Sequence, residues 1–329
     1  MDEDGYKKYW KERDFPQEKL EDAIKILKEF EDFLPNKSID DATYVDLHNF
    51  SAELISEDKN KFENYIYLLR YGFLRKNNPF IIACMEVIDG GEVMVNFSNR
   101  LIEEFGEDFR NKIFEGLEIP PLGLHPKEKP KITKQLIERF EKAVDSDTCV
   151  KFLGKGLRDP YTEARKPDRE KFLKAGNIDE FLKKKHTDFV ATLEKHKNDG
   201  TLFFTQEIDD QVIEYIRKTS FCEAGIRKGD KIIISKIPYM TKQWLNETDE
   251  TLKRYYYCHC PWAREAIKNP KDLVSPVFCN CSAGYYKQYW DIVLERDTHV
   301  EVLESVIQGD AICKFVLQLP EDIVKEAEQ

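Results

Sequence analysis

The 329-residue sequence lacks a long apolar run: none approaches the roughly 18 residues that a membrane-spanning helix needs. Its first ten residues, MDEDGYKKYW, lack the apolar core of a signal peptide. Internal repeats and low-complexity tracts are also missing. With 41% hydrophobic and 34% charged residues, the composition is that of a folded globular chain and not of a disordered one. These features predict a soluble, cytoplasmic protein that is long enough for two domains.

Familiar catalytic and cofactor motifs are missing as well. The sequence has no Ser-His-Asp order, no H-E-x-x-H and no dinucleotide-binding glycine motif. Residues 154–156 read GKG, but they lack the spacing of a phosphate-binding loop. The surrounding polar segment 154–168 is predicted to be a surface loop, and a substrate-facing or interface loop is the alternative. These patterns assign no catalytic residue, and they leave open whether the protein is an enzyme.

Positive charge is scarce in the first part of the chain. Residues 1–130 contain 28 acidic and 18 basic side chains, a net charge of −10, whereas residues 131–329 contain 34 and 33, a net charge of −1. The total of −11 therefore comes almost entirely from the N-terminal part. Such a surface repels a nucleic-acid backbone, so nucleic-acid binding is not expected there.

Helical periodicity dominates the first 119 residues. Apolar positions recur every three to four residues in segments 16–34, 38–56, 60–73, 80–88 and 97–105. We therefore predict an all-helical bundle over residues 1–119. Its layout loosely resembles the core-binding domain of tyrosine recombinases, which implies DNA contact; because the charge opposes this, dimerisation or partner contact is the alternative.

The proline-rich segment 120–130 is predicted to be a linker, because periodicity stops on both sides of it. Beyond it, residues 131–200 are again mostly helical, and KIIISK at 231–236 is typical of a buried strand. Segments 299–307 and 311–319 predict a β-hairpin. The expected fold class is α+β: a helical bundle followed by a domain, residues 131–329, with an antiparallel sheet and a C-terminal β-hairpin.

Four of the eight cysteines form two Cys-x-Cys pairs, Cys258/Cys260 and Cys279/Cys281. Each pair ends an extended-looking run, and residues two apart in an extended segment face the same side. Helical runs follow both pairs, so Cys260 and Cys281 are expected at helix N-termini, which favour thiolates. Disulfides are rare in the cytoplasm. The pairs therefore predict a zinc site of thiolates; redox-active or nucleophilic cysteines and inert packing are the alternatives.

A fifth cysteine extends this site. Alternation in segment 311–319 turns Cys313 inward, where it is either a core residue or a further ligand. Glu304 is a possible oxygen ligand, and His259 is expected to point away from the ion because it lies between two cysteines. The predicted metal ligands are thus Cys258, Cys260, Cys279, Cys281 and Cys313. The dispersed Cys84, Cys149 and Cys222 are expected to be small buried side chains.

The segments FCNCSAGYYKQYWD and VEVLESVIQGDAICKF resemble the C-terminal signature of 4-vinyl reductase-type domains, which are small-molecule sensor modules that hold zinc. They are also similar to L-2-amino-thiazoline-4-carboxylic acid hydrolase-like proteins. YYYCHCPWARE together with CNCSAGYYK resembles a related, uncharacterised bacterial and archaeal Cys-rich family. The matching positions are Gly284-Tyr285 after the second pair and Gly309-Asp310 before Cys313. The sensor domains usually have a cysteine where this chain has Ser305, and Cys258 and Cys260 are expected to replace the missing sulfur.

The resemblance implies a zinc-binding protein whose C-terminal α+β domain binds a small-molecule ligand. Trp262, Arg264, Tyr285 and Lys287 stand near the cysteines and are candidate ligand-binding residues, with Arg264 and Lys287 suited to a carboxylate. The alternative functions are a hydrolase acting on a small carboxylated C–N substrate and a DNA-associated regulator. Because four thiolates leave no open position on zinc, a structural ion is favoured over a catalytic one.

Overall fold

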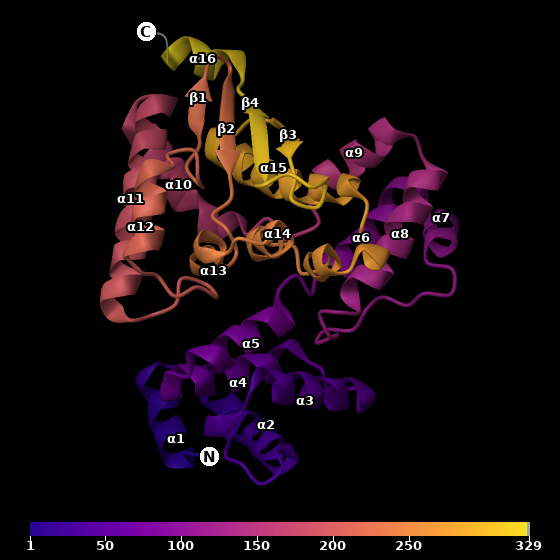
Figure 1. The fold of residues 1–329 in the computed structure, drawn as a ribbon, viewed down its shortest axis with the longest axis vertical. Coiled ribbons are helices and arrows are strands. Elements are labelled where there is room, and N and C mark those ends of the chain that lie inside the picture. Colours follow the sequence, from indigo (N-terminus) through magenta and orange to yellow (C-terminus); the bar gives the residue numbers. More distant parts are fainter. Residues whose placement is uncertain (328–329) are drawn as a thin grey trace. The chain divides into compact units, whose positions relative to one another are not determined.

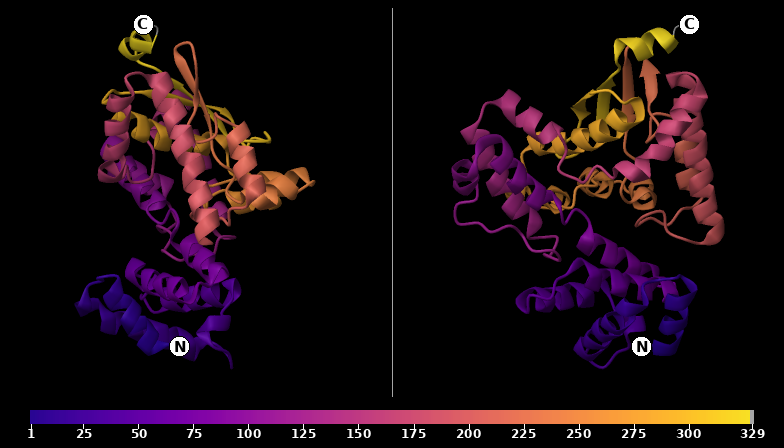
Figure 2. Two further views of the ribbon diagram at one scale, coloured as in Figure 1. Left: turned by 90° about the vertical axis from the view of Figure 1, so that its left-hand side faces the viewer. Right: turned by 180° about the vertical axis from the view of Figure 1, so that it is seen from behind.

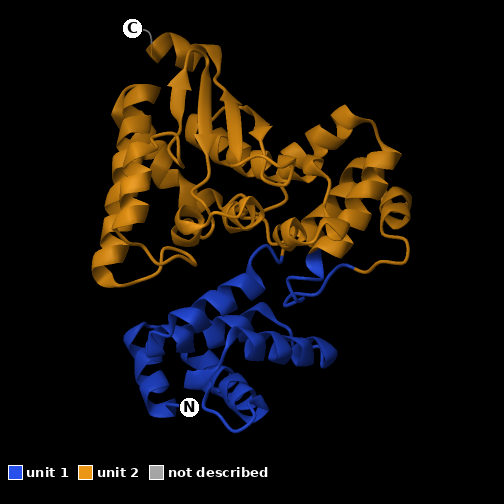
Figure 3. Ribbon diagram, viewed as in Figure 1, with its two compact units in different colours: residues 1–91, 119–129 blue, residues 92–118, 130–329 orange. Residues whose placement is uncertain are grey.

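The computed structural model describes residues 1–327 and divides the chain into two compact units. Unit 1 consists of Met1–Gly91 and Ile119–Lys129, and unit 2 consists of Glu92–Glu118 and Pro130–Gln329 (Figure 3). Within residues 1–327, no helix is both long and apolar enough to cross a membrane.

Unit 1 is helical (Figure 1). Thr43 and Asp46 form a capping box that starts its third helix, and the Asn77 side chain caps the fifth, which has proline near its start. The core contains large aromatic residues such as Trp10, Phe30 and Tyr65, each fully buried. The helices are α1 (Glu3–Glu12), α2 (Leu20–Phe33), α3 (Tyr44–Ser56), α4 (Phe62–Arg75) and α5 (Asn78–Ile88), with short 3-10 turns at Gln17–Lys19 and Ile39–Asp41.

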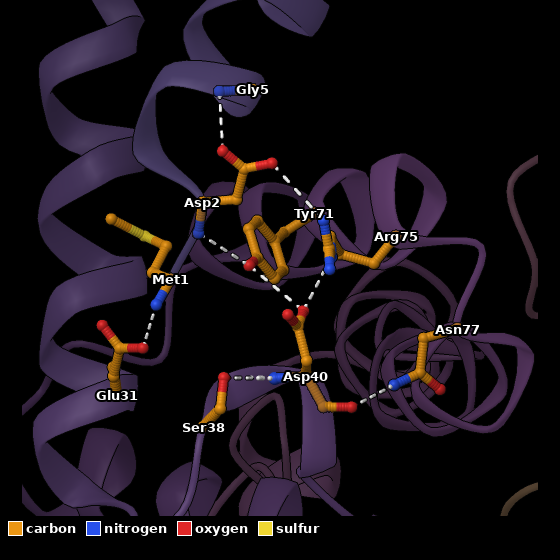
Figure 4. Close-up of polar contacts among 9 residues, drawn as sticks. All are labelled: Met1, Asp2, Gly5, Glu31, Ser38, Asp40, Tyr71, Arg75 and Asn77. Atoms are coloured by element: carbon orange, nitrogen blue, oxygen red, sulfur yellow. Dashed lines mark hydrogen bonds and ion pairs between the residues drawn. The ribbon is translucent and has the colours of Figure 1, made fainter.

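A polar network centred on Asp40 ties the start of the chain to α4 and α5 (Figure 4). Asp40 Oδ1 accepts hydrogen bonds from Tyr71 Oη (3.2 Å) and Arg75 Nε (2.9 Å). The Asp40 carbonyl accepts from Asn77 Nδ2 (3.1 Å), and Tyr71 Oη accepts from the Asp2 backbone N–H (3.0 Å). The carboxylate and backbone carbonyl of Asp40, together with the phenol of Tyr71, thus connect four segments of unit 1.

Unit 2 combines helices with one sheet. A four-stranded antiparallel sheet has the order β1-β2-β4-β3, and Ile234 of β2 lies opposite Phe315 of β4. Helix α15 (Asn280–Leu294) crosses one face of this sheet, while α11 (Ile178–Asp199) and α12 (Asp210–Lys218) lie side by side next to it (Figures 1 and 2). The strands are β1 (Ile226–Lys228), β2 (Lys231–Ser235), β3 (His299–Glu304) and β4 (Lys314–Gln318).

Eleven α-helices of unit 2 lie within the described residues. Several begin at side-chain caps: Asn177 caps α11, Asp209 caps α12 and Asp249 caps α14. The helices are α6 (Val93–Phe105), α7 (Glu107–Ile113), α8 (Lys129–Ala143), α9 (Ser146–Gly154), α10 (Thr162–Ala175), α11 (Ile178–Asp199), α12 (Asp210–Lys218), α13 (Thr241–Asn246), α14 (Glu250–Tyr257), α15 (Asn280–Leu294) and α16 (Glu321–Ala327). Three 3-10 turns, Arg264–Lys268, Pro270–Asp272 and Pro276–Cys279, precede α15.

The predicted α+β fold class is confirmed: a helical N-terminal region is followed by an antiparallel sheet that contains the C-terminal β-hairpin. The division of the chain differs from the predicted one, because residues 92–118 belong to unit 2. Phe97 of α6 packs edge-to-face against Phe140 of α8 and Phe152 of α9, with ring centroids 5.8 and 5.6 Å apart.

The predicted linker also differs from the structure, since residues 119–129 are part of unit 1. Gly123 accepts a hydrogen bond from Ser51 Oγ (2.9 Å), and Leu122 accepts one from Asn60 Nδ2 (2.9 Å). Gly123 has φ +89°, and a Cβ there would overlap the hydroxyl groups of Ser51 and Tyr65. The segment is therefore packed against the bundle and is not a free spacer.

Helix α3 contains a buried histidine, His48. His48 is 4% exposed and lies between the rings of Tyr44 (4.1 Å) and His125 (4.9 Å). Neither of its ring nitrogens has a hydrogen-bond partner among the described residues. Burial, assisted by the nearby His125 and Lys129, lowers the pKa of His48 to about 4.

We predict that protonation of His48 destabilises unit 1 as pH falls. A free histidine has a pKa near 6.5, so below that pH the unfolded chain binds a proton that the folded chain refuses until about pH 4. The free energy of unfolding should fall by up to about 3 kcal/mol between these pH values. The difference between wild-type protein and His48→Gln, measured by urea unfolding from pH 7 to 4, isolates this contribution. If the free energies of unfolding of the two proteins change in parallel with pH, the predicted contribution of His48 is contradicted.

Candidate functional site

Four of the five predicted sulfur ligands surround one small cavity in unit 2. Cys258 and Cys260 follow α14, Cys279 ends the 3-10 turn before α15, and Cys313 precedes β4. The cavity has a volume of about 20 Å³, which is room for one water molecule or one ion. Its other lining residues are Lys236, His259, Ser282, Val302, Glu304, Ser305, Ile307 and Phe315.

The end of α14 is anchored to the end of β2, and this places the first cysteine pair. Tyr257 is fully buried, and its hydroxyl donates to the Lys236 carbonyl (2.7 Å). Met240 N–H donates to the Tyr256 carbonyl (2.9 Å). The His259 ring contacts the Ile237 carbonyl through Nε2 and lies against Tyr239. The cysteines on both sides of His259 therefore have a fixed backbone.

The loop between β3 and β4 places Cys313. The Ser305 backbone N–H donates to Asp310 Oδ2 (2.7 Å), and the Ser305 carbonyl accepts from the N–H groups of Gln308, Gly309 and Asp310. Gly309 has φ +115°, a conformation that suits glycine. The Gly309-Asp310 motif singled out in the sequence is thus the turn that brings Ser305 and Cys313 to the same cavity.

Each of the five sulfur atoms has a hydrogen-bond partner of its own. Donors directed at sulfur are the arrangement found around metal-bound thiolates, where they hold the ligand and stabilise its charge. Four sulfurs accept from a backbone N–H: Cys258 from Cys260, Cys260 from Trp262, Cys281 from Leu157 and Cys313 from Val306. The Cys279 sulfur lies 2.9 Å from the Ser305 hydroxyl oxygen.

Without a cation, these sulfurs are held as neutral thiols. Burial is the largest cause that raises the pKa of each, and it raises the pKa of Cys260 to about 11. Neighbouring sulfurs add to this, since Cys313 raises the pKa of both Cys258 and Cys279. Lys236 acts in the opposite direction, and its Nζ donates to Ser282 Oγ (3.2 Å). The sulfurs are therefore close enough to repel one another once charged.

The structure differs from the sequence analysis at both cysteine pairs, and at the first pair helix α14, not an extended run, ends directly before Cys258. At the second pair, the segment Pro276–Cys279 is a 3-10 turn, and Cys281 lies in the first turn of α15, so the two cysteines do not share the face of a strand. Two residues along a helix are rotated by about 200°. Cys279 consequently faces the cavity, whereas Cys281 lies outside its lining and accepts from Leu157 N–H.

The four predicted ligand-binding residues also lie outside the cavity lining. Lys287 forms ion pairs with Asp291 (2.6 Å) and Asp297 (2.5 Å). Arg264 is 5% exposed and stacks over the Tyr239 ring, with Cζ 4.1 Å from its centroid. The other two are Trp262, which is buried, and Tyr285, which lies under the Arg165 guanidinium. Packing and ion pairing thus engage these side chains.

Sequence reasoning missed Lys236 and Ser282 as cavity residues. Lys236 ends the apolar run KIIISK, where a terminal lysine is usually solvent-exposed, so its sequence carried no functional signal. Across residues 1–327, moreover, no three side chains of His, Cys, Asp or Glu are already arranged to hold a metal ion. Metal binding at this cavity would require the cysteine side chains to rotate towards one point.

A close contact between two glycines fixes the start of α15. A Cβ on Gly284 would overlap the Gly156 backbone nitrogen and would lie 2.5 Å from Gly156 Cα and 2.7 Å from the Gly154 carbonyl oxygen. Gly156 itself has φ +79°. This contact holds the segment whose Leu157 N–H binds Cys281.

We predict that Gly284→Ala lowers the free energy of unfolding by at least about 3 kcal/mol, because the added methyl group meets backbone and not a flexible side chain. Gly154→Ala is the matched control, since a Cβ at Gly154 meets nothing within 4 Å. Its effect should stay within about 1 kcal/mol. Urea unfolding of both variants measures the difference, and equal stabilities would contradict the packing described here.

Residues 201–324 match a family described as a family of unknown function, DUF6144. The matched segment contains both cysteine pairs, Cys313 and all four strands. No curated protein and no solved structure matches the chain.

Proposed function

We propose that unit 2 binds one zinc ion through the sulfur atoms of Cys258, Cys260, Cys279 and Cys313. The observation that carries this proposal is that four sulfurs from three segments of the chain line one ion-sized cavity. Four thiolates complete the tetrahedral coordination of a structural zinc ion. The hydrogen-bond donors around these sulfurs suit bound thiolates, and the rotation that brings the sulfurs together involves only short side chains.

The size of the cavity favours an ion over an organic molecule. Sites for drug-sized ligands commonly enclose about 300–1,000 Å³, whereas this cavity has about 20 Å³. Four sulfur ligands also leave zinc no position for substrate or water. The proposed ion would therefore be a cross-link between the end of α14, the start of α15 and the β3–β4 loop. Small-molecule binding and hydrolysis stay predictions from the sequence resemblance.

We predict that protein purified under reducing conditions contains one zinc ion per chain, measured by elemental analysis. Cys279→Ser should lose the ion, because a buried hydroxyl is a poor replacement for a thiolate. Removal of zinc by a chelator should lower the Tm by on the order of 10 °C, since losing several kcal/mol shifts a unit of this size by about 2–4 °C per kcal/mol.

Cys281→Ser is the matched control, because Cys281 lies two residues after Cys279, in the first turn of α15, but outside the cavity lining. This variant should keep its zinc ion. If Cys281→Ser loses zinc and Cys279→Ser keeps it, the fourth ligand is Cys281, which the sequence analysis also included among the ligands. Wild-type protein without stoichiometric metal, and with unchanged Tm after chelation, would contradict the proposal.

A further inference from the structure

Ser305 contacts the sulfur of a proposed zinc ligand. It follows Glu304 at the end of β3 and is 1% exposed. Its hydroxyl oxygen lies 2.9 Å from Cys279 Sγ, and both residues line the cavity. The contact joins the β3–β4 loop to the start of α15.

The direction of this hydrogen bond follows from the state of Cys279, because a metal-bound thiolate carries no hydrogen and can only accept. The Ile307 backbone N–H donates to Ser305 Oγ (3.2 Å) and so occupies one of its lone pairs. A hydroxyl has a single hydrogen. Ile307 needs an acceptor and a metal-bound sulfur needs a donor, so the hydroxyl hydrogen is directed to Cys279.

The backbone of Ser305 is held independently of the cysteines. Its N–H donates to Asp310 Oδ2 (2.7 Å), and its carbonyl accepts three backbone N–H groups from residues 308–310. The oxygen is therefore a fixed point to which the Cys279 side chain is oriented. Ser282 offers a contrast, because it also lines the cavity but its hydroxyl accepts from Lys236 Nζ (3.2 Å).

We propose that Ser305 is a positioning residue of the sulfur site: its hydroxyl donates to Cys279, selects the side-chain rotamer that faces the cavity and reduces the negative charge that this sulfur donates to the metal ion. The inference rests on the proposed zinc site. Outer hydrogen bonds of this kind typically change metal affinity by about 10–100-fold.

The test compares Ser305→Ala, Ser305→Thr and Ser282→Ala, each loaded with Co²⁺ as a spectroscopic probe and titrated with Zn²⁺ against a chromophoric chelator. Ser305→Ala should bind Zn²⁺ about 10–100-fold more weakly. Its sulfur-to-cobalt charge-transfer band should shift to lower energy, because the sulfur becomes more electron-rich. Ser305→Thr should restore the affinity and the band. Ser282→Ala should keep both, apart from a change of about threefold or less in affinity.

A second measurement needs no variant. In wild-type protein loaded with cadmium-113, the Ser305 hydroxyl proton should show a scalar coupling to the metal through Cys279 Sγ. Its absence in the cadmium-bound protein, or a Ser305→Ala variant with wild-type affinity and an unshifted cobalt band, would overturn the role of Ser305 and leave the zinc site standing. A wild-type protein that takes up none of the three metals would instead overturn the proposed function itself.

Discussion

The packing of α15 against the sheet is the constraint on which unit 2 depends. Trp290 and Val293 are fully buried in the same cluster as Ile234 and Phe315, so one side of the helix forms the sheet's apolar cover. Burying a large apolar side chain contributes about 2–3 kcal/mol. Near its other end, Gly284 touches the segment after α9 through backbone atoms alone. With both ends held, the first turn of α15 has little freedom.

That constraint sets the geometry of the sulfurs. Because the first turn is fixed, Cys279 and Cys281 face in different directions, one to the cavity and one to Leu157. The end of α14 is tied to the end of β2 by the buried hydroxyl of Tyr257. Three backbone segments thus bring four cysteine side chains to the lining of one cavity. Neutral thiols that lie close together contribute little stability. As thiolates they would repel one another, and a bound cation would replace this repulsion by the attraction of each sulfur to the ion.

Local patterns in the sequence predicted the N-terminal helices, the hairpin and the gathering of cysteines, but not the start of α10 (Thr162–Ala175), which lies in the segment 154–168 predicted to be a surface loop. Segment 311–319 contains the observed strand β4, although Phe315, Val316 and Leu317 are all buried and do not alternate. The enrichment of cysteine between residues 258 and 281 identified most of the cavity's sulfurs. The run VFC before Cys281 resembled a strand because β-prone residues in a short segment do not distinguish a strand from a 3-10 turn. Pro276 and the following long helix decide its conformation.

The division into units depended on contacts that local patterns do not contain. Phe97 belongs to a helix with ordinary periodicity, but its partners Phe140 and Phe152 occur much later in the chain. Helical periodicity does end at the prolines at residues 120 and 121. The segment that follows them, however, packs in unit 1 and does not link unit 1 to a later domain. Similarly, no local pattern predicts that Lys236 and Ser282 line the cavity, because only the tertiary fold brings them close to the cysteines.

The passage of the chain from unit 1 to unit 2 and back has a consequence for synthesis. Residues 119–129 complete unit 1, and Gly123 accepts from the buried Ser51, but residues 92–118 belong to the other unit. On the ribosome, the bundle therefore emerges without its last segment, and a stretch with exposed phenylalanines is made in between. Domains generally fold as they are synthesised, N-terminal part first. Here the segment that completes the first unit is translated after part of the second, so unit 1 reaches its final contacts only once residues 92–118 have been made.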